Sequence, residues 1–355
     1  MGTQSTAGES AGGSRARIAK PSLTFNGKNV DESLKPYLVS VTYVDPAEGE
    51  SDSITVELMN RDLIWLKDWY PQLGDTIEGT LKFIRWEGSS TLTLPCGSLL
   101  CDTITASGWE HVFKIEGVSS PINTDFDTKD VTKTWKDVTL AGVGNQIAGK
   151  YGMSCEYEAD EIKIKSLEQT EKTDCKFLEE TVKKYGLCMK IYKKKIRIFD
   201  KGKLEEKGPV KTIKLTDMVD GNYTYKDSAQ GVYDGAEIKY KNGKKESDTL
   251  KITVSASKKP VKGSRMLKIS QKADDAKEAR RIAAAKVNES NEKQETMNTS
   301  IWPDVSVVAG VTVTISGFGH ADGKYFVDKV TWRMEGDGKA SQDLEMHKCQ
   351  TRIKA

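Results

Sequence analysis

The first third of the chain alternates apolar and polar residues in a way that predicts short β-strands. Ile54–Leu58 alternates with a period of two, and Val112–Glu116 does so more loosely, as expected for strands with one buried face. Three dipeptides between such segments are typical of turns: Gly74-Asp75, Glu87-Gly88 and Ser107-Gly108. Short strands broken by turns indicate a small β-barrel or sandwich.

From about Thr132 the hydrophobic spacing becomes helical. The following residues can share one helical face: Trp135, Val138, Ile147, Ala148 and Tyr151. Gly152 then stands where a C-cap would stand. The pattern therefore predicts a helix that contains Trp135 and ends before Gly152.

A second helix is predicted after a strand at 161–167. Thr173 can cap its start, and Asp174 is favourable in its first turn. An apolar stripe of Phe177, Leu178, Thr181, Val182 and Tyr185 follows, and Gly186 ends the helix. Cys188–Phe199 then has the pattern of a hairpin, so this region is predicted to be a small α/β domain.

The last part of the chain is again β in character, with one helix. Segments 232–240 and 250–255 flank Asn242-Gly243, a strong hairpin turn signal. Apolar residues recur on one side of 274–288, which predicts a helix. Val311–Ile315 alternates cleanly within a β region that covers Trp302–Met334.

One sequence pattern occurs in both β regions. Gly97-Ser-Leu-Leu-Cys-Asp102-Thr-Ile104 matches Gly323-Lys-Tyr-Phe-Val-Asp328-Lys-Val330. A weaker match lies upstream of each, between 73–77 and 309–313. Either the chain holds two similar β domains around an α/β insertion, or unrelated hairpins match by chance.

Composition narrows the class of protein. The 355 residues are enough for two or three domains, and 54 Lys and Arg balance 52 Asp and Glu, unlike the basic excess of a general nucleic-acid binder. No apolar run is long enough for a transmembrane helix. Residues 1–19 lack the apolar core of a signal peptide and are expected to form a flexible arm.

The residues that could carry chemistry do not form a known catalytic pattern. The three histidines lie in unrelated segments, and the six cysteines form no CxxC pair. We therefore expect no cofactor, no metal and no enzymatic activity. The basic run Lys190–Lys203 is better explained as the solvated face of a hairpin than as a nucleic-acid site. The helix at 274–288 can contact another subunit or pack on its own domain.

Three segments resemble a known family. Gln169, Asp174, Phe177 and Leu178, followed by Tyr185-Gly186-Leu187, resemble the Gln-x-x-x-x-Asp-x-x-Phe-Leu segment of the phage late control D family. The segments Gly317–Asp328 and Cys96–Asp102 resemble its β segments. These proteins are baseplate hubs of contractile tails, related to the amino-terminal part of the type VI secretion spike. One departure is Trp332, near a position where many members have His.

The resemblance implies a fold and a division into domains. The expected class is α+β, mainly β, with two similar small β-barrels, an inserted α/β domain and one long helix before the last strands. The expected boundaries are a flexible arm at 1–19, a first barrel at 20–118 (with part of 203–222 as a candidate for completing it), an α/β domain at 119–202, and a second barrel at 203–355 with its helix at about 274–288.

The resemblance also implies a non-enzymatic structural role. The expected hub is a homotrimer that adapts a hexameric tail tube to a trimeric spike. Its implied partners are the tube protein, a spike protein, other baseplate proteins and a tape measure protein, with no specific nucleic acid and no stable membrane insertion. Because the chain ends at Ala355, the spike is expected to be a separate polypeptide. Assembly is expected in the bacterial cytoplasm, as part of a phage or a phage-tail-like bacteriocin.

The repeat supplies the candidate interface residues. They are Gly97, Asp102, Ile104, Gly323, Tyr325, Asp328 and Val330. Binding through strand edges and broad surfaces is expected rather than binding in a pocket. Two alternative functions remain open, a carbohydrate- or wall-binding β protein and a peptidoglycan hydrolase. Dispersed Trp residues disfavour the first of these.

Overall fold

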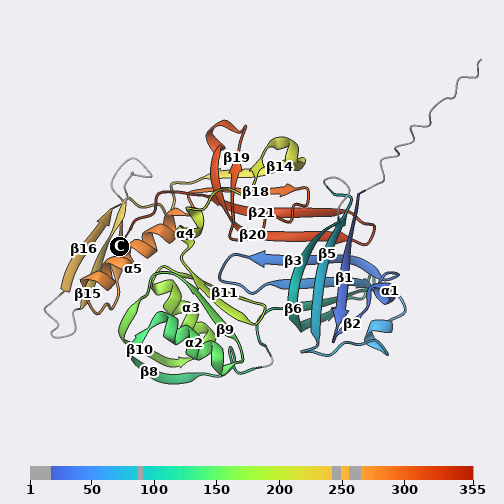
Figure 1. Cartoon of the computed structure of the whole chain (residues 1–355), viewed down its shortest axis with the longest axis horizontal. Helices are drawn as coiled ribbons and strands as arrows, with labels where there is room; N and C mark the ends of the chain where they lie inside the picture. Colours follow the sequence, from blue (N-terminus) through green and yellow to red (C-terminus); the bar gives the residue numbers. More distant parts are fainter. Residues whose placement is uncertain (1–16, 87–90, 123, 242–248, 256–264, 355) are drawn as a thin grey trace, which may run out of the picture.

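The computed structural model describes residues 17–86, 91–122, 124–241, 249–255 and 265–354. Figure 1 shows a broad layer of strands, an α/β lobe beneath it and a smaller unit with a helix beside it. The expected turns at Glu87-Gly88 and Asn242-Gly243, and most of the expected N-terminal arm, lie outside the described residues. Strand β1 begins at Ile18, within the segment expected to be an arm.

Among the described residues, the largest sheet has thirteen strands. Eleven of them are neighbours in the order β14 (Met218–Asp227), β18 (Glu295–Ile301), β21 (Ala340–Lys348), β20 (Gly323–Glu335), β3 (Leu38–Pro46), β4 (Ser53–Met59), β7 (Val112–Val118), β6 (Thr91–Ala106), β5 (Thr76–Ile84), β1 (Ile18–Phe25) and β2 (Lys28–Asn29). The other two are β13 (Thr212–Ile213) and β19 (Thr312–Ile315), which pair with each other, and β19 also pairs with β20. Since β20 pairs with β3, the first and last β regions share one sheet and one hydrophobic core.

The α/β lobe lies between β7 and β14 in the chain. Its elements are β8 (Val131–Thr139), α2 (Leu140–Lys150), β9 (Ser154–Glu158), β10 (Lys163–Lys172), α3 (Asp174–Lys184), β11 (Cys188–Tyr192) and β12 (Lys195–Phe199). Thr173 caps α3 as predicted, because its Oγ accepts the Lys176 N–H at 3.2 Å. The predicted hairpin is confirmed as β11 and β12.

The prediction that Trp135 and Val138 lie on a helix is wrong. Both lie on β8, which pairs with β10, and α2 begins only after its N-cap Thr139. Trp135 is buried with its ring stacked on Phe177 at 6.0 Å. Asp137, between the two, has a φ of 49°. This left-handed residue interrupts the strand alternation, so residues three apart can face one core and imitate helical spacing.

A third unit is an excursion between β14 and β18. It consists of β15 (Gly235–Lys241), β16 (Thr249–Ser255), β17 (Met266–Ser270) and α5 (Ala276–Asn291). Helix α5 packs on this small sheet through Ile282, Ala283 and Val287. Short helical segments complete the described chain: α1 (Asp31–Leu34), η1 (Ile64–Leu66), α4 (Lys201–Glu205), η2 (Leu215–Asp217) and η3 (Gly319–Ala321).

The described residues thus form a mainly β fold with helices in separate lobes, which confirms the predicted α+β class. Their strand pairings trace a continuous sheet and no closed barrel. The two-barrel form of the prediction is therefore not confirmed. No helix of the described chain is both long and apolar enough to span a membrane.

Helix α2 offers a test of close packing against the lobe's sheet. A Cβ on Gly144 would lie 2.9 Å from both the Cys155 sulfur and the Ile198 Cδ1, whereas a Cβ on Gly149 of the same helix would meet no atom within 4 Å. Alanine adds about 1 kcal/mol of helix propensity at either site, but overpacking costs about 1–3 kcal/mol. Urea denaturation should show Gly149→Ala unchanged or stabilised, and Gly144→Ala about 1–3 kcal/mol less stable than Gly149→Ala. Equal stability of the two variants would contradict the packing.

Candidate interface strands and the buried junction

Two units of the large sheet have the same topology. The first has the strand order β3–β4–β7–β6–β5, and the second has β14–β18–β21–β20–β19. Corresponding strands also follow one another in the same order along the chain. The predicted internal repeat is therefore a structural repeat, and chance similarity does not explain it.

The β5–β6 and β19–β20 hairpins agree bond for bond. The Gly74 N–H donates to the Cys101 carbonyl at 2.7 Å, and the Cys101 N–H donates to the Asp75 carbonyl at 2.8 Å. In the second unit, Gly310 corresponds to Gly74 and Val327 corresponds to Cys101. Both of the equivalent hydrogen bonds measure 2.9 Å. The candidate glycines begin the equivalent strand segments, with a φ of 87° at Gly97 and 149° at Gly323.

The two candidate aspartates occupy the same β-bulge. The register of β6 with β7 shifts between Cys101 and Thr103, and that of β20 with β21 shifts between Val327 and Lys329. A bulge bends a strand and redirects its side chains. The shared bulge explains why the sequence match includes an Asp at this position.

A further repeated motif was missed in the sequence. Segments 42–47 and 224–229 both read Thr-Tyr-x-Asp-x-Ala and lie on the corresponding strands β3 and β14. The Tyr43 hydroxyl donates to Asp52 at 2.9 Å, and the Tyr225 hydroxyl donates to Glu295 at 2.8 Å. The spacing between this motif and the glycine motif differs in the two halves, because β15–β17 and α5 are inserted in the second. A search at fixed spacing therefore does not connect them.

The candidate interface residues differ in exposure. Tyr325 and Val330 are fully buried in this chain, and the Tyr325 hydroxyl donates to the Ala321 carbonyl at 2.8 Å. Asp102 is exposed and Ile104 half-buried. A Cβ on Gly97 would lie 3.2 Å from Lys193 of the α/β lobe. The first-unit strand is thus accessible beyond its bulge, while the second-unit strand is covered. Their role as interface residues stays a prediction.

The second bulge joins a buried network of charges where the lobes meet, which we call the junction network. Its members are Glu48, Lys201, Glu205, Glu292, Asp328, His347 and Arg352. His347 lies with Nδ1 2.8 Å from Asp328 and Nε2 2.9 Å from Glu205. Arg352 bridges Glu205 and Glu292, and Lys201 bridges Glu292 and Glu48. The network therefore ties α4, the end of α5, the C-terminal segment and the large sheet together.

Charges in the junction network hold one another in the ionised state. Burial alone would lower the pKa of His347, but its hydrogen bonds to Asp328 and Glu205 outweigh burial and raise the pKa to about 9. Burial would raise the pKa of Glu205, yet His347 and Arg352 lower the pKa to about 2. An imidazolium with both N–H groups donating satisfies both carboxylates.

The same cluster contains the one grouping of potential metal ligands found in the described part of the chain. Ligand atoms of Glu205, Glu292 and His347 lie within 4.8 Å of one another. Arg352 and Lys201 already bind these carboxylates at 2.5–2.8 Å. A cation would have to displace two paired basic side chains, so the cluster is a structural ion network.

A second buried ion cluster ties the α/β lobe to the sheet. Lys190 of β11 contacts Asp45 of β3 and lies 2.9 Å from Asp52. Burial, partly offset by Lys190, raises the pKa of Asp52 to about 6. Together with the junction network, this contact fixes the lobe against the large sheet.

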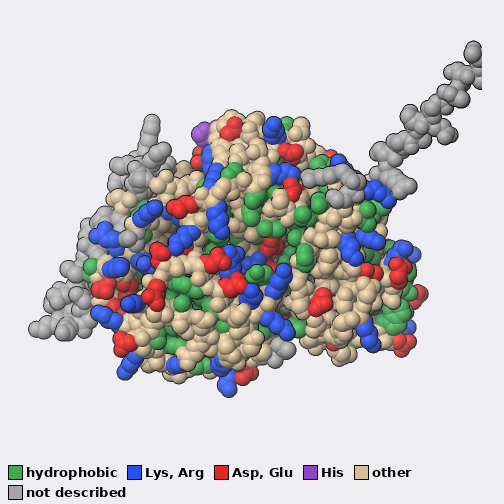
Figure 2. All heavy atoms as spheres, in the orientation of Figure 1, with side chains coloured by type: hydrophobic (Ala, Val, Ile, Leu, Met, Phe, Trp, Pro, Cys, Tyr) green, Lys and Arg blue, Asp and Glu red, His purple; other side chains and the backbone are tan. Residues whose placement is uncertain are grey.

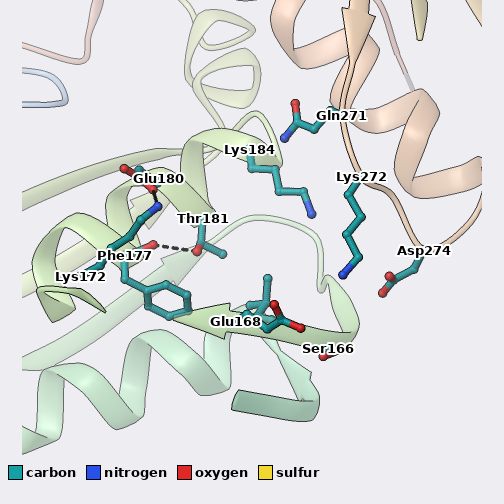
Figure 3. A pocket seen from close by; sticks show the side chains of 11 residues that line it. Ser166, Glu168, Lys172, Phe177, Glu180, Thr181, Lys184, Gln271, Lys272 and Asp274 are labelled. Atoms are coloured by element: carbon teal, nitrogen blue, oxygen red, sulfur yellow. Dashed lines mark hydrogen bonds and ion pairs between the residues drawn. The ribbon is translucent and has the colours of Figure 1, made fainter. Parts of the chain in front are cut away.

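A groove lies between the α/β lobe and the α5 unit. It has a volume of about 380 Å³, and Figure 3 shows Lys184, Lys272 and Asp274 facing it. Lys172 pairs with Glu180 on its other side. Its lining includes no His or Cys. The groove is a polar seam between the two lobes.

Comparison with solved structures identifies the fold. A 43 kDa tail protein of prophage MuSo2 from Shewanella oneidensis superposes with a TM-score of 0.69 and 13% identity over 94% of this chain and 98% of that chain. A tail protein from Neisseria meningitidis gives a TM-score of 0.69 and 10% identity over 94% and 97%. A component of the E. coli type VI secretion system, described as similar to the T4 tail proteins gp27 and gp5, gives 0.51 and 10% over 90% and 75%.

The chain therefore has the fold of phage tail proteins, as the sequence resemblance implied. No protein-family description matches the sequence. No curated protein matches it either.

The junction network makes stability depend on pH in a predictable direction. Because the folded-state pKa of His347 is about 9 against an ordinary 6.5, its stabilisation is complete below about pH 6.5 and is lost as the pH rises through about 9. The shift corresponds to about 3 kcal/mol of unfolding free energy. Urea denaturation of the wild type at about pH 6 and pH 10 should show this loss. His347→Gln should be less stable at pH 6 and lose clearly less on the same change. Equal losses in both proteins would contradict the assignment.

Proposed function

We propose that the chain is the structural baseplate hub of a contractile tail, a trimeric adapter between a six-fold tail tube and a three-fold spike. The observation that carries the proposal is the structural repeat of β3–β7 in β14 and β18–β21. The phage-tail fold supports the same role.

The repeat gives a physical reason for three copies. A trimer of this chain presents six units of similar backbone, which can meet six tube subunits in nearly equivalent ways. The α/β lobe and the α5 unit occur once per chain. A face built from these lobes keeps only three-fold symmetry, which suits a trimeric spike.

The expected partners follow from the proposal. They are two further copies of the chain, the tube protein, a separate spike protein, other baseplate proteins and a tape measure protein, in a particle assembled in the bacterial cytoplasm. Figure 2 shows basic and acidic side chains interspersed over the visible face, which favours protein contacts over nucleic acid. A non-enzymatic role is proposed because the solved structures that share this fold are phage tail proteins.

The carbohydrate-binding alternative gains little from the aromatic cluster of Tyr37, Trp65 and Trp69. The three rings pack edge-on against one another, with centroids 5.3–5.9 Å apart. Trp65 is buried and Trp69 is 43% exposed. Edge-on packing builds a small hydrophobic core and leaves no flat platform for a sugar ring.

The proposal predicts the mass of the purified protein. Light scattering should give three times 39.3 kDa, or about 118 kDa, for the protein alone, and a mass larger than this by that of the bound partner when a spike protein is added. Electron micrographs of the same sample should show rings. A stable monomer of 39.3 kDa that binds neither tube nor spike protein would contradict the proposed function.

A further inference from the structure

The two units use the edges of their equivalent strands differently. Along one edge, β20 pairs first with β19 and then, from Lys329 to Glu335, with β3 of the other unit. Its counterpart β6 pairs with β5 up to Leu100. Among the described residues, no backbone pairing is recorded on that edge for Thr103–Ala106. In the first unit, β6 thus has no partner strand that corresponds to β3 beside β20.

Strand β14, the counterpart of β3, also has an edge without a neighbouring strand among the described residues. Strand β3 lies between β4 and β20, whereas β14 pairs with β18 alone and ends the path of the thirteen-stranded sheet in the described chain. Residues Asn222–Thr224 and Lys226–Asp227 are exposed. Within the described residues, β6 and β14 therefore each have an unpaired edge, and these two edges correspond to the two that are joined inside the chain.

We propose that β6 of one copy pairs with β14 of a second copy in the register that β20 makes with β3. Transferring that register places Thr103 opposite Ser228, Ile104 opposite Asp227, Thr105 opposite Lys226, and Ala106 opposite Tyr225 of the second copy. The inference rests on the proposed trimeric hub and names the surface that closes it. Open edges favour this kind of addition.

Side chains at the open edges match those at the joined ones. Asp45 at the joined edge accepts the Ala309 N–H at 3.0 Å. The position equivalent to Asp45 is Asp227, and the position equivalent to Ala309 is Leu73, which is 65% exposed. In the proposed pairing, the Asp227 carboxylate of the second copy accepts the Leu73 N–H. Equivalent aspartates would thus accept equivalent N–H groups, Asp45 within one chain and Asp227 between two chains.

Large apolar side chains are exposed beside both open edges. Trp109, in the turn that follows β6, is 93% exposed, and Tyr223 on β14 is 44% exposed. Exposed aromatic residues beside an unpaired edge are typical of interface anchors. Continuation of the proposed register brings Trp109 near the Tyr223 end of β14 in the second copy and covers both.

The proposed contact is head-to-tail, and this determines which assembly it can form. Each copy offers one β6 edge and one β14 edge, so each copy binds one neighbour at either side. A heterologous contact of this type closes into a ring when its rotation permits. Since the contact repeats the relation between the two units of one chain, a closed trimer holds six units in one cycle.

Disulfide trapping of the full chain tests the register. Thr105→Cys with Lys226→Cys places two thiols directly opposite, where cross-strand Cβ atoms lie about 4.5–5.5 Å apart, close to disulfide distance. Both residues are exposed, so the fold should tolerate the changes. The expected result after mild oxidation is covalent dimers and trimers on a non-reducing gel, reversed by reductant.

Matched controls isolate the pairing. Val44→Cys with Thr331→Cys reproduces the pair inside one chain and should form a disulfide without any rise in mass. Thr105→Cys with Thr224→Cys shifts the register by two residues, to about 7–8 Å, and should trap little. The wild type, whose six cysteines are free, gives the background.

Two outcomes would overturn the inference, and they are distinguishable. If the wild type is trimeric by light scattering but the Thr105→Cys/Lys226→Cys chain traps no more than the shifted pair, the register is wrong and the proposed function stands. If all chains stay monomeric with and without the spike protein, the proposed function and the edge pairing fail together.

Discussion

The antiparallel pairing of β20 with β3 is the contact on which the rest of the structure depends. It spans Lys329–Glu335 and Ser40–Pro46 and converts two repeated units into one sheet with one core. Backbone hydrogen bonds fix strand register, and a shift of one residue would turn buried faces outward. The two units are therefore held in one defined relation, and any assembly that repeats that relation inherits its geometry.

Charged contacts attach the lobes to this frame. A small apolar cluster of Ala47, Phe199 and Phe326 lies at the same place, but it is much smaller than the other cores. Compared with well-packed apolar residues, buried ion pairs add little net stability because desolvation offsets their attraction, although removing one partner of a pair is costly. They do penalise every arrangement that leaves a charge unpaired. We infer that the junction network and Lys190 set the orientation of the α/β lobe more than they set its stability.

Much of the fold followed from local sequence signals, and the rest depended on contacts between distant segments. The cap at Thr173 and the match between the Gly97 and Gly323 segments could be predicted from the sequence, because each signal lies within a few consecutive residues. The strand at Trp135 was misassigned, because one left-handed residue changed its period. His347 and Glu205, 142 residues apart, carry no shared pattern, so the junction network has no signal in the sequence.

The two halves of the repeat have diverged in a manner that suits one internal and one external contact. The first-unit Asp45 is 8% exposed and bound to Lys190 and Ala309, while its counterpart Asp227 lies at the surface with His320 3.9 Å away. The second-unit Asp328 binds His347, while its counterpart Asp102 is exposed. The exposure of Asp227 is what the proposed edge pairing requires, because its carboxylate would accept the Leu73 N–H of another copy as Asp45 accepts the Ala309 N–H within the chain.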